Sequence, residues 1–430
     1  MSAYKKMTDN ELREELKSLR EEYAKLCESG LNLDMSRGKP GLDQIAISME
    51  LFDVFTSESE VVSENGFDCR NYGLLDGPPE AKRMMASIMN TTEDHVIVYG
   101  NSSLNVMYDQ VSEFYSHGVN GMTPWCKLDK VKWLCPVPGY DRHFSITEHF
   151  GIEMINVPMN EDGPDMDVVE QFVEKDDSIK GIWCVPLYSN PEGASYSDDV
   201  VRRFANLKPA AKDFRIFWDN AYAVHHLYDE PEKQDKILDI LEECEKAGNP
   251  DMAIEFASTS KITFPGSGIA ALASSINNVN HIRDSLSIQT IGHDKINMLR
   301  HVKLFKDHEG IKEHMSKHAA LLRDKFNAVL DVFDEELAPC EIAIWTKPRG
   351  GYFISLHVEN NCAKKIVKMC KEAGMVLTGA GATFPYHIDP YDSVIRIAPS
   401  YPTPEELKKA SHVLAVCTKI ATIEKEGIKA

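Results

Sequence analysis

The sequence lacks any apolar run of the roughly 20 residues that a membrane-spanning helix needs. It also lacks an apolar leader, because Lys5, Lys6, Glu11 and Glu14 lie among its first residues. Basic residues are few, with 47 Lys and Arg against 67 Asp and Glu, for a net charge of −20. Such a charge repels nucleic acid and anionic membranes. We therefore expect a cytoplasmic protein that binds neither nucleic acid nor a membrane.

The ten cysteines are scattered and show neither C-x-x-C nor C-x-x-H spacing. A chain of 430 residues can bury enough core to fold without disulfides. We expect reduced cysteines and no metal site. The sequence also lacks internal repeats, low-complexity linkers and the G-x-x-x-x-G-K phosphate-binding motif.

Apolar segments typical of buried strands alternate with helical stretches such as 198–207 and 234–246. The predicted strands are 95–99, 131–135, 152–157, 181–186, 214–218, 254–258 and 268–273. This alternation predicts an α/β domain built on a mostly parallel sheet.

The C-terminal part of the chain has a different pattern. Residues 297–333 are helical and charged, and predict a bridge out of the large domain. Beyond them, the pattern predicts strands at 341–346, 351–357 and 393–398, and helices at 361–374 and 403–423. These elements indicate a smaller α+β domain.

Near the N-terminus, Thr8 and Glu11 form a capping-box pattern that begins an amphipathic helix ending near Gly30. We predict that this helix and the following loop, residues 1–55, belong to the small domain. The predicted large domain spans residues 56–310, and the small C-terminal domain spans residues 311–430.

Several polar residues lie just past the ends of predicted strands, namely Ser102, Tyr140, Asn190, Asp219 and Lys261. Functional groups of such sheets collect at the carboxyl ends of the strands, so we expect these side chains to converge. Ser102 follows a strand and precedes a helix, a geometry that can hold a phosphate. An ordinary helix cap explains Ser102 equally well.

Lys261 ends a small-residue stretch at a chain turn, which suits a lysine that forms a Schiff base in a shielded pocket. A solvated surface lysine is the alternative. If a phosphorylated aromatic aldehyde bound here, Asp219 could pair with its ring nitrogen. Asn190 and Tyr222 could bond its phenolate oxygen, and Tyr140 could stack on its ring. The alternatives are turn capping for Asp219, the start of a turn for Asn190 and ordinary packing for Tyr140.

Eight motifs occur in a fixed order along residues 30–400. They are Arg37-Gly38-Lys39-Pro40, Asn71-Tyr72-Gly73, Gly100 to Leu104, Pro138-Gly139-Tyr140, Asn190-Pro191-Glu192-Gly193, Asp219-Asn220-Ala221-Tyr222, Ser258-Thr259-Ser260-Lys261 and Ile395-Arg396-Ile397-Ala398. The ordered set resembles the fold-type I pyridoxal-phosphate enzymes, specifically the aspartate aminotransferase superfamily (class I/II aminotransferases). The resemblance implies a large, mostly parallel (mixed) sheet of seven-stranded type and a smaller α+β domain.

The resemblance also implies pyridoxal 5'-phosphate (PLP) as the cofactor and gives each matching residue a role. Lys261, Asp219 and Tyr222 are the implied catalytic residues. The implied cofactor-binding residues are these three together with Asn101, Ser102, Ser103, Tyr140, Asn190 and Ser258. Tyr72 matches a tyrosine that reaches the phosphate of a neighbouring subunit, which implies a homodimer with shared active sites.

For the substrate, Arg396 matches the arginine that grips the α-carboxylate by a bidentate pair, assisted by Asn190 and by the backbone of Gly38. Arg37 is our hypothesis for the group that binds a distal carboxylate, because it lies beside Gly38. Without the family pattern, Arg396 would be interpreted as a strand arginine in a surface ion pair.

Two positions depart from the family pattern. The turn after the lysine usually reads P-G-x-R-x-G, but Gly268 stands at the place of the phosphate-binding arginine. Ser267, the serine-rich loop or a cation from residues 283–303 could meet the phosphate charge instead. The usual N-P-T-G also reads N-P-E-G at residues 190–193. With these features, the chain is similar to a divergent bacterial subgroup described as aspartate aminotransferases.

The expected activity is transfer of an amino group from an L-amino acid, most favourably L-aspartate, to 2-oxoglutarate. Alternatives are an aminotransferase for aromatic or other amino acids and a PLP-dependent C–S or β-lyase. A PLP-binding regulator is the non-enzyme alternative, but residues 1–30 are too few and too acidic for a DNA-reading domain.

Overall fold

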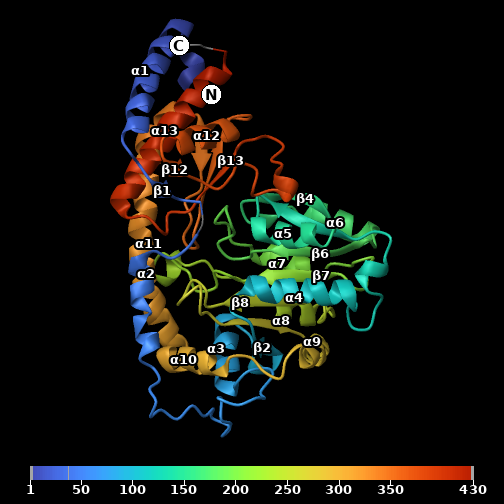
Figure 1. Ribbon diagram of the computed structural model, residues 1–430. Coiled ribbons are helices and arrows are strands. Elements are labelled where there is room, and N and C mark those ends of the chain that lie inside the picture. The colour runs from blue at the N-terminus through green and yellow to red at the C-terminus, as the bar shows by residue number, and fades with distance from the viewer. Residues whose placement is uncertain (1–2, 37, 428–430) are drawn as a thin grey trace.

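The computed structural model describes residues 3–36 and 38–427. A large sheet covered by helices fills one end of the molecule, and a second group of elements containing both chain ends fills the other (Figure 1). No helix among the described residues is long and apolar enough to cross a membrane.

The large sheet has eight strands in the order β2-β9-β8-β7-β6-β3-β4-β5. Their bounds are β2 (Val96–Val98), β3 (Lys132–Val137), β4 (Glu153–Asn160), β5 (Gly163–Pro164), β6 (Ile179–Cys184), β7 (Arg215–Asp219), β8 (Ala253–Ser258) and β9 (Ala270–Ser274). The pairings within β4-β3-β6-β7-β8 are parallel, and β9 and β5 run antiparallel to their neighbours. The mixed, mostly parallel sheet is therefore confirmed, and the strand beyond the expected seven is the two-residue edge β5.

Both faces of this sheet are buried, because successive side chains of a strand point to opposite faces. On β7, Trp218 belongs to one apolar core and Phe217 to the other. The first core includes residues of α3 (Pro79–Ile88), α6 (Met166–Lys175), α7 (Asp198–Ala205), α8 (Ile240–Lys246) and α10 (Lys295–Phe305). The second includes residues of α4 (Ser103–Ser116), α5 (Asp141–His149) and α9 (Ile276–Gln289). Helices thus cover the strands on both sides, and loops at the strand ends remain to form a site.

The second group of elements surrounds a three-stranded antiparallel sheet in the order β10-β11-β13 and a short parallel pair β1-β12. The strands are β1 (Leu33–Asp34), β10 (Ala343–Trp345), β11 (Ile354–Val358), β12 (Met375–Val376) and β13 (Val394–Ile397). The helices are α1 (Asp9–Glu28), α2 (Leu42–Ile47), α11 (His308–Glu336), α12 (Ala363–Glu372) and α13 (Pro404–Lys425).

Short 3-10 helices occur along the whole chain, at Ala3–Lys6, Met49–Phe52, Glu93–His95, Trp125–Lys127, Pro231–Lys233, Ala338–Cys340 and Pro385–His387.

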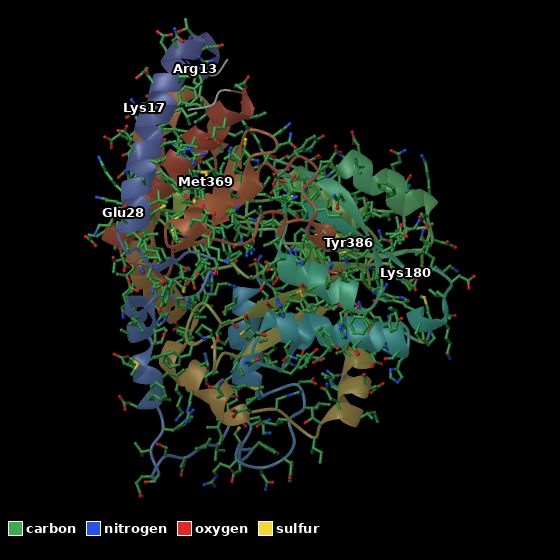
Figure 2. All side chains as sticks on the ribbon, turned by 45° about the horizontal axis from the view of Figure 1, so that its top comes forward. Arg13, Lys17, Glu28, Lys180, Met369 and Tyr386 are labelled. Carbon is green, nitrogen blue, oxygen red and sulfur yellow. The ribbon has the colours of Figure 1, made fainter. Side chains whose placement is uncertain are left out.

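Helix α1 packs onto this group as its sequence predicts. Thr8 and Glu11 form the capping box at its start. Arg13 and Lys17 are exposed along its outer side, whereas Met369 lies on α12 (Figure 2). The Tyr23 hydroxyl donates to the Met369 carbonyl at 3.0 Å, so the N-terminal helix is tied to residues more than 300 positions away.

The charged stretch expected as one helical bridge is two helices, α10 and α11. The chain breaks at Lys306, which has a φ of 66°, and Asp307 caps α11 by accepting from the Gly310 amide. Helix α11 has 29 residues, or about 43 Å at 1.5 Å per residue. Its early residue Met315 lies in the core of the large sheet and its later residue Phe326 in the core of the small one. The domain boundaries near residues 55 and 310 stay a prediction.

A buried histidine on α10 supports the turn that carries Lys261. The Thr259 and Thr263 hydroxyls lie 3.1 and 2.9 Å from His301 Nε2, and His301 Nδ1 lies 2.8 Å from the Asn297 carbonyl. Burial lowers the pKa of His301 from 6.5 to about 4. The folded chain therefore holds this imidazole neutral at pH values where the unfolded chain has already protonated it.

We predict that this histidine makes the protein less stable in mild acid. Between pH 6.5 and about 4 the unfolded state binds the extra proton, so the free energy of unfolding falls as the pH falls, by about 1.4 kcal/mol per pH unit. Replacing His301 with Gln should reduce the loss between pH 7 and pH 5 by about 2 kcal/mol. Urea unfolding at the two pH values measures this difference.

The matched control is His117→Gln, because the His117 side chain is 71% exposed. This control should lose as much stability as the wild type, since carboxylates elsewhere titrate equally in both. If His301→Gln also lost as much as the wild type, then His301 would not be the source of the acid sensitivity.

Candidate active site

A cavity of about 270 Å³ lies where the parallel strands of the large sheet end. Among the residues that line it are Gly38, Ser102, Ser103, Tyr140, Asn190, Asp219, Tyr222, Ser258 and Lys261. The five strand-end residues that we expected to converge all belong to this set. A larger hollow of about 840 Å³, lined by residues of α3 and α8 among others, contains none of the predicted site residues.

Lys261 follows β8 by three residues and is only partly exposed. Its ammonium lies 4.9 Å from the centre of the Tyr222 ring. Burial lowers the pKa of Lys261, while the negative charge of Asp219 acts in the opposite direction. A lowered pKa increases the fraction of free amine, which is the form that attacks a carbonyl.

Asp219 is the last residue of β7, and its side chain is 2% exposed. Its Oδ2 lies 2.9 Å from His143 Nε2, and the His143 ring stacks on Trp183 with ring centres 4.6 Å apart. Its Oδ1 is also buried and has no hydrogen-bond partner among the described residues. A buried acceptor without a partner is costly, so this oxygen is suited to accept a hydrogen bond from a bound molecule.

The sequence alone did not reveal His143. It lies three residues after Tyr140, but its partner Asp219 is 76 positions away. A lone histidine in a helical pattern gives no indication of such a distant contact. The position of His143 three residues after Tyr140 would have been informative only if the order of the strands in the sheet had been known.

Asn190, Tyr222 and Tyr140 surround the same space. The Asn190 side-chain oxygen accepts from Arg396 Nη1 at 3.3 Å. The Tyr222 ring is buried and lies parallel to the ring of Tyr352 at 6.2 Å, and burial raises the pKa of Tyr222 well above its ordinary value. The Tyr140 ring contacts His143 edge-on at 4.9 Å. These contacts fix three polar groups on the cavity wall.

The end of the cavity near α4 is rich in hydroxyl groups. Ser102 caps α4 by accepting from the Asn105 amide at 3.4 Å, so the helix N-terminus opens beside it. The Ser258 hydroxyl donates to Ser260, which in turn donates to the Asn101 carbonyl at 3.2 Å. Helix N-termini and hydroxyls together suit an anion. The side chain of Asn101 is outside the set of cavity residues.

The structure gives a physical reason for the missing arginine in the turn after Lys261. A Cβ at Gly268 would lie 2.9 Å from the Asn101 carbonyl and 3.2 Å from the Ser260 amide nitrogen. No larger side chain fits there unless this backbone moves, because real Cβ atoms essentially never approach so closely. The close approach of the two loops thus requires glycine where the family pattern has arginine.

Two of the cations in residues 283–303 are engaged elsewhere. Arg283 pairs with Asp76 at 2.7 Å, and the Lys303 ammonium lies over the Phe55 ring. The Ser267 carbonyl accepts from the Asn297 amide group at 3.0 Å. The serines that line the cavity and the N-terminus of α4 offer hydrogen-bond donors to an anion at this end.

Arg396 on β13 lies behind Asn190 and is 5% exposed. Its Nη1 donates to Asp141 Oδ1 at 2.7 Å, its Nη2 donates to Thr378 Oγ1 at 3.2 Å, and its plane lies over the Phe353 ring. A Cβ at Gly38 would lie 2.6 Å from the tip of Phe353, so glycine brings the backbone of this loop close to that ring.

Besides Asn101 and Arg396, two further predicted residues are not among those that line the cavity. Arg37 lies outside the described residues. Tyr72 is 76% exposed and does not line the cavity of its own chain. The neighbouring cation Lys39 does line it, with its ammonium 3.6 Å from Asp34 and 4.0 Å from the centre of the Tyr401 ring. Among the residues described, no cluster of His, Cys, Asp and Glu could hold a metal ion.

Several relatives and solved structures that this chain resembles are named aminotransferases. The family model described as aspartate amino-transferase matches residues 7–429. An aspartate aminotransferase of Corynebacterium glutamicum is 45% identical over 408 residues, which cover 94% of this chain and 93% of that protein. The crystal structure of an aspartate transaminase from the same organism has a TM-score of 0.94, 43% identity and 97% coverage of both chains.

A more distant structure shares the fold alone. The α-aminoadipate aminotransferase of Thermus thermophilus, complexed with N-(5'-phosphopyridoxyl)-L-leucine, is 17% identical with a TM-score of 0.74, over 94% of this chain and 95% of that one. The family match covers nearly the whole chain, and the Corynebacterium relative is 45% identical over 94% of it. The chain therefore belongs to the aspartate aminotransferase family and is an aminotransferase.

Proposed function

We propose that this aminotransferase uses PLP in the 270 Å³ cavity to move an amino group from L-aspartate to 2-oxoglutarate. One observation carries the proposal: Lys261 and the unpaired Oδ1 of Asp219 line the same cavity. The residues present fit the cofactor, because they supply an amine for its aldehyde, a carboxylate for its ring nitrogen and hydroxyls for its phosphate. The distant Thermus relative was crystallised with a phosphopyridoxyl compound, which supports the same choice.

Bound PLP would supply an electron-poor ring and an aldehyde carbon that can accept an amino group and pass it on. Asp219 Oδ1 would accept the N–H of the ring nitrogen, and the His143 hydrogen bond to Oδ2 keeps the carboxylate in place. Asn190 and Tyr222 would bind the ring oxygen from one side. Lys261 Nζ, with its lowered pKa, would remove and return a proton at the α-carbon of the substrate.

The charge of the substrate follows from the cations near the cavity. Arg396 would bind the α-carboxylate, and its contact with Asn190 places it behind the cavity wall. A second carboxylate needs a second cation. Gly38 and Lys39 line the cavity, and Arg37 directly precedes them in the sequence. We assign the distal carboxylate to Arg37. The names of the Corynebacterium relatives support aspartate as the donor.

We also propose a homodimer in which Tyr72 completes the active site of the partner. A tyrosine that is 76% exposed leaves much apolar surface in water, and Leu42, Phe52 and Ile291 are likewise exposed by 63% or more. Such a set is typical of a surface that another subunit covers. The ten cysteines form no disulfide among the described residues, which agrees with our proposal of a reducing, cytoplasmic location.

Spectroscopy of the purified holoenzyme tests the cofactor and the donor together. We expect a visible band that L-aspartate removes with formation of oxaloacetate and that 2-oxoglutarate restores. Borohydride should fix a pyridoxyl group on Lys261, as peptide mapping would show. The Lys261→Ala variant should lose this adduct, and its kcat should fall by about 10²- to 10⁴-fold because no base remains at the α-carbon.

The matched control is Lys246→Ala, because Lys246 is an exposed lysine of α8 with its side chain 56% accessible. It should keep the band and the activity. A band that responds to another amino acid but not to aspartate would preserve the aminotransferase and reject the donor.

The Arg37 assignment predicts a change in substrate affinity alone. Arg37→Ala should raise KM for aspartate roughly 10- to 100-fold, since hydrogen bonds to a charged group contribute about 1.5–3 kcal/mol. KM for L-alanine, which has no distal carboxylate, should not change. Steady-state kinetics with both donors provides the test.

Lys39→Ala is the comparison variant, because Lys39 is the neighbouring cation at the cavity. A larger effect of Lys39→Ala on KM for aspartate, with Arg37→Ala unchanged, would transfer the assignment from Arg37 to Lys39.

Tyr72→Phe tests the shared site. Loss of the hydroxyl should raise the Kd for PLP about tenfold, while light scattering should still give the mass of a dimer. Tyr391→Phe is the control, because Tyr391 is 65% exposed and should leave PLP binding unchanged. A monomeric wild-type protein, or a Tyr72→Phe variant that binds PLP normally, would contradict the proposal.

A further inference from the structure

The buried guanidinium of Arg396 already holds a carboxylate. Its Nη1 lies 2.7 Å from Asp141 Oδ1 and also contacts the Asn190 oxygen at 3.3 Å. Arg396 is 5% exposed, whereas the Asp141 side chain is 25% exposed. Asp141 is thus already bound to the guanidinium of Arg396, which in the proposed function binds a carboxylate of the substrate.

The two ends of this ion pair differ in how firmly they are held. Besides its contact with Asp141, the guanidinium is bound by Asn190 and Thr378 and packs on the face of Phe353. Asp141 is the first residue of α5, and its partly exposed side chain has access to water. If the pair opens, Asp141 is the partner that can move into solvent, while the arginine stays in place.

The charges oppose simultaneous binding of two carboxylates. One guanidinium carries a single positive charge, so a second carboxylate arrives against the repulsion of the first. An empty, unpaired guanidinium in this buried position would also be costly. Arg396 Nε is buried and has no partner among the described residues, so the group retains a donor for an additional ligand.

We propose that the carboxylate of Asp141 takes the place of the substrate carboxylate in the free enzyme. It pairs with Arg396 there, and it leaves Arg396 when the substrate binds. The proposal rests on the function proposed above, in which Arg396 binds the α-carboxylate. Asp141 then lowers the affinity for every carboxylate ligand and speeds release of the product. It acts on binding through Arg396 and takes no part in proton transfer.

Calorimetric titration of the holoenzyme with succinate and with 3-phenylpropionate tests this competition. Asp141→Asn keeps an oxygen that can accept from Arg396 but removes the charge. We expect the Kd of both probes to fall about two- to fivefold, the range of a partly exposed ion pair. KM for the amino donor should fall by a similar factor, and kcat should change less than KM. Asp141→Ser, which also removes the charge, should act in the same direction and serves if the first variant folds poorly.

The matched control is Asp167→Asn, because Asp167 also lies in the first turn of a helix and pairs with an arginine, Arg203, away from the cavity. Its Kd values should equal those of the wild type. Unchanged or weaker binding in both Asp141 variants would overturn the proposal, and weaker binding would show that Asp141 holds Arg396 in position for the ligand.

The two probes separate this proposal from the choice of substrate. Both need the guanidinium of Arg396, but only succinate has a second carboxylate. If aspartate proves not to be the donor, the Kd of Asp141→Asn for 3-phenylpropionate, divided by that of the wild type, should still be below one. If the wild-type holoenzyme transaminates aspartate and the ratio stays at one, the competition alone is rejected.

Discussion

The site depends on the hydrogen bond between Asp219 and His143 beneath the cavity. Both side chains are 2% exposed, so the carboxylate has lost nearly all of its water and needs a fixed donor. His143 supplies that donor to Oδ2 and is itself held by stacking on Trp183. One oxygen of the carboxylate is therefore fixed, and the other is left without a partner at the cavity. This arrangement orients an acceptor towards a ligand in a way that a solvated aspartate could not.

The loops around this pair depend on close backbone contacts. Gly268 lets the turn after Lys261 approach Asn101, and Gly38 lets the substrate loop lie on Phe353. The first contact leaves no room for a side chain, which explains why glycine stands at position 268. Hydroxyls and the N-terminus of α4 line this end of the cavity and offer their dipoles to it. The buried His301 supports the same turn, because the Thr259 hydroxyl lies 3.1 Å from His301 Nε2.

The sequence predicted the sheet and most of the cavity because both depend on local patterns. Apolar runs followed by Tyr140, Asn190, Asp219 and Lys261 indicate strand ends, and a parallel sheet brings strand ends together. The break at Lys306 was missed because both flanking stretches have helical patterns. His143 and Asp141 were missed for another reason. Their partners, Asp219 and Arg396, are distant in the sequence. An aspartate and a histidine are also ordinary residues in the first turn of a helix.

These two missed residues show how one turn of helix serves two sites. Successive residues of an α-helix are rotated by about 100°, so positions 141 and 143 differ by about 200° and face opposite sides. Asp141 accordingly reaches Arg396 on β13, and His143 reaches Asp219 on β7. The first turn of α5 lies between Arg396 and the buried acid. A shift of this turn would therefore move the hydrogen-bond partners of both side chains at once.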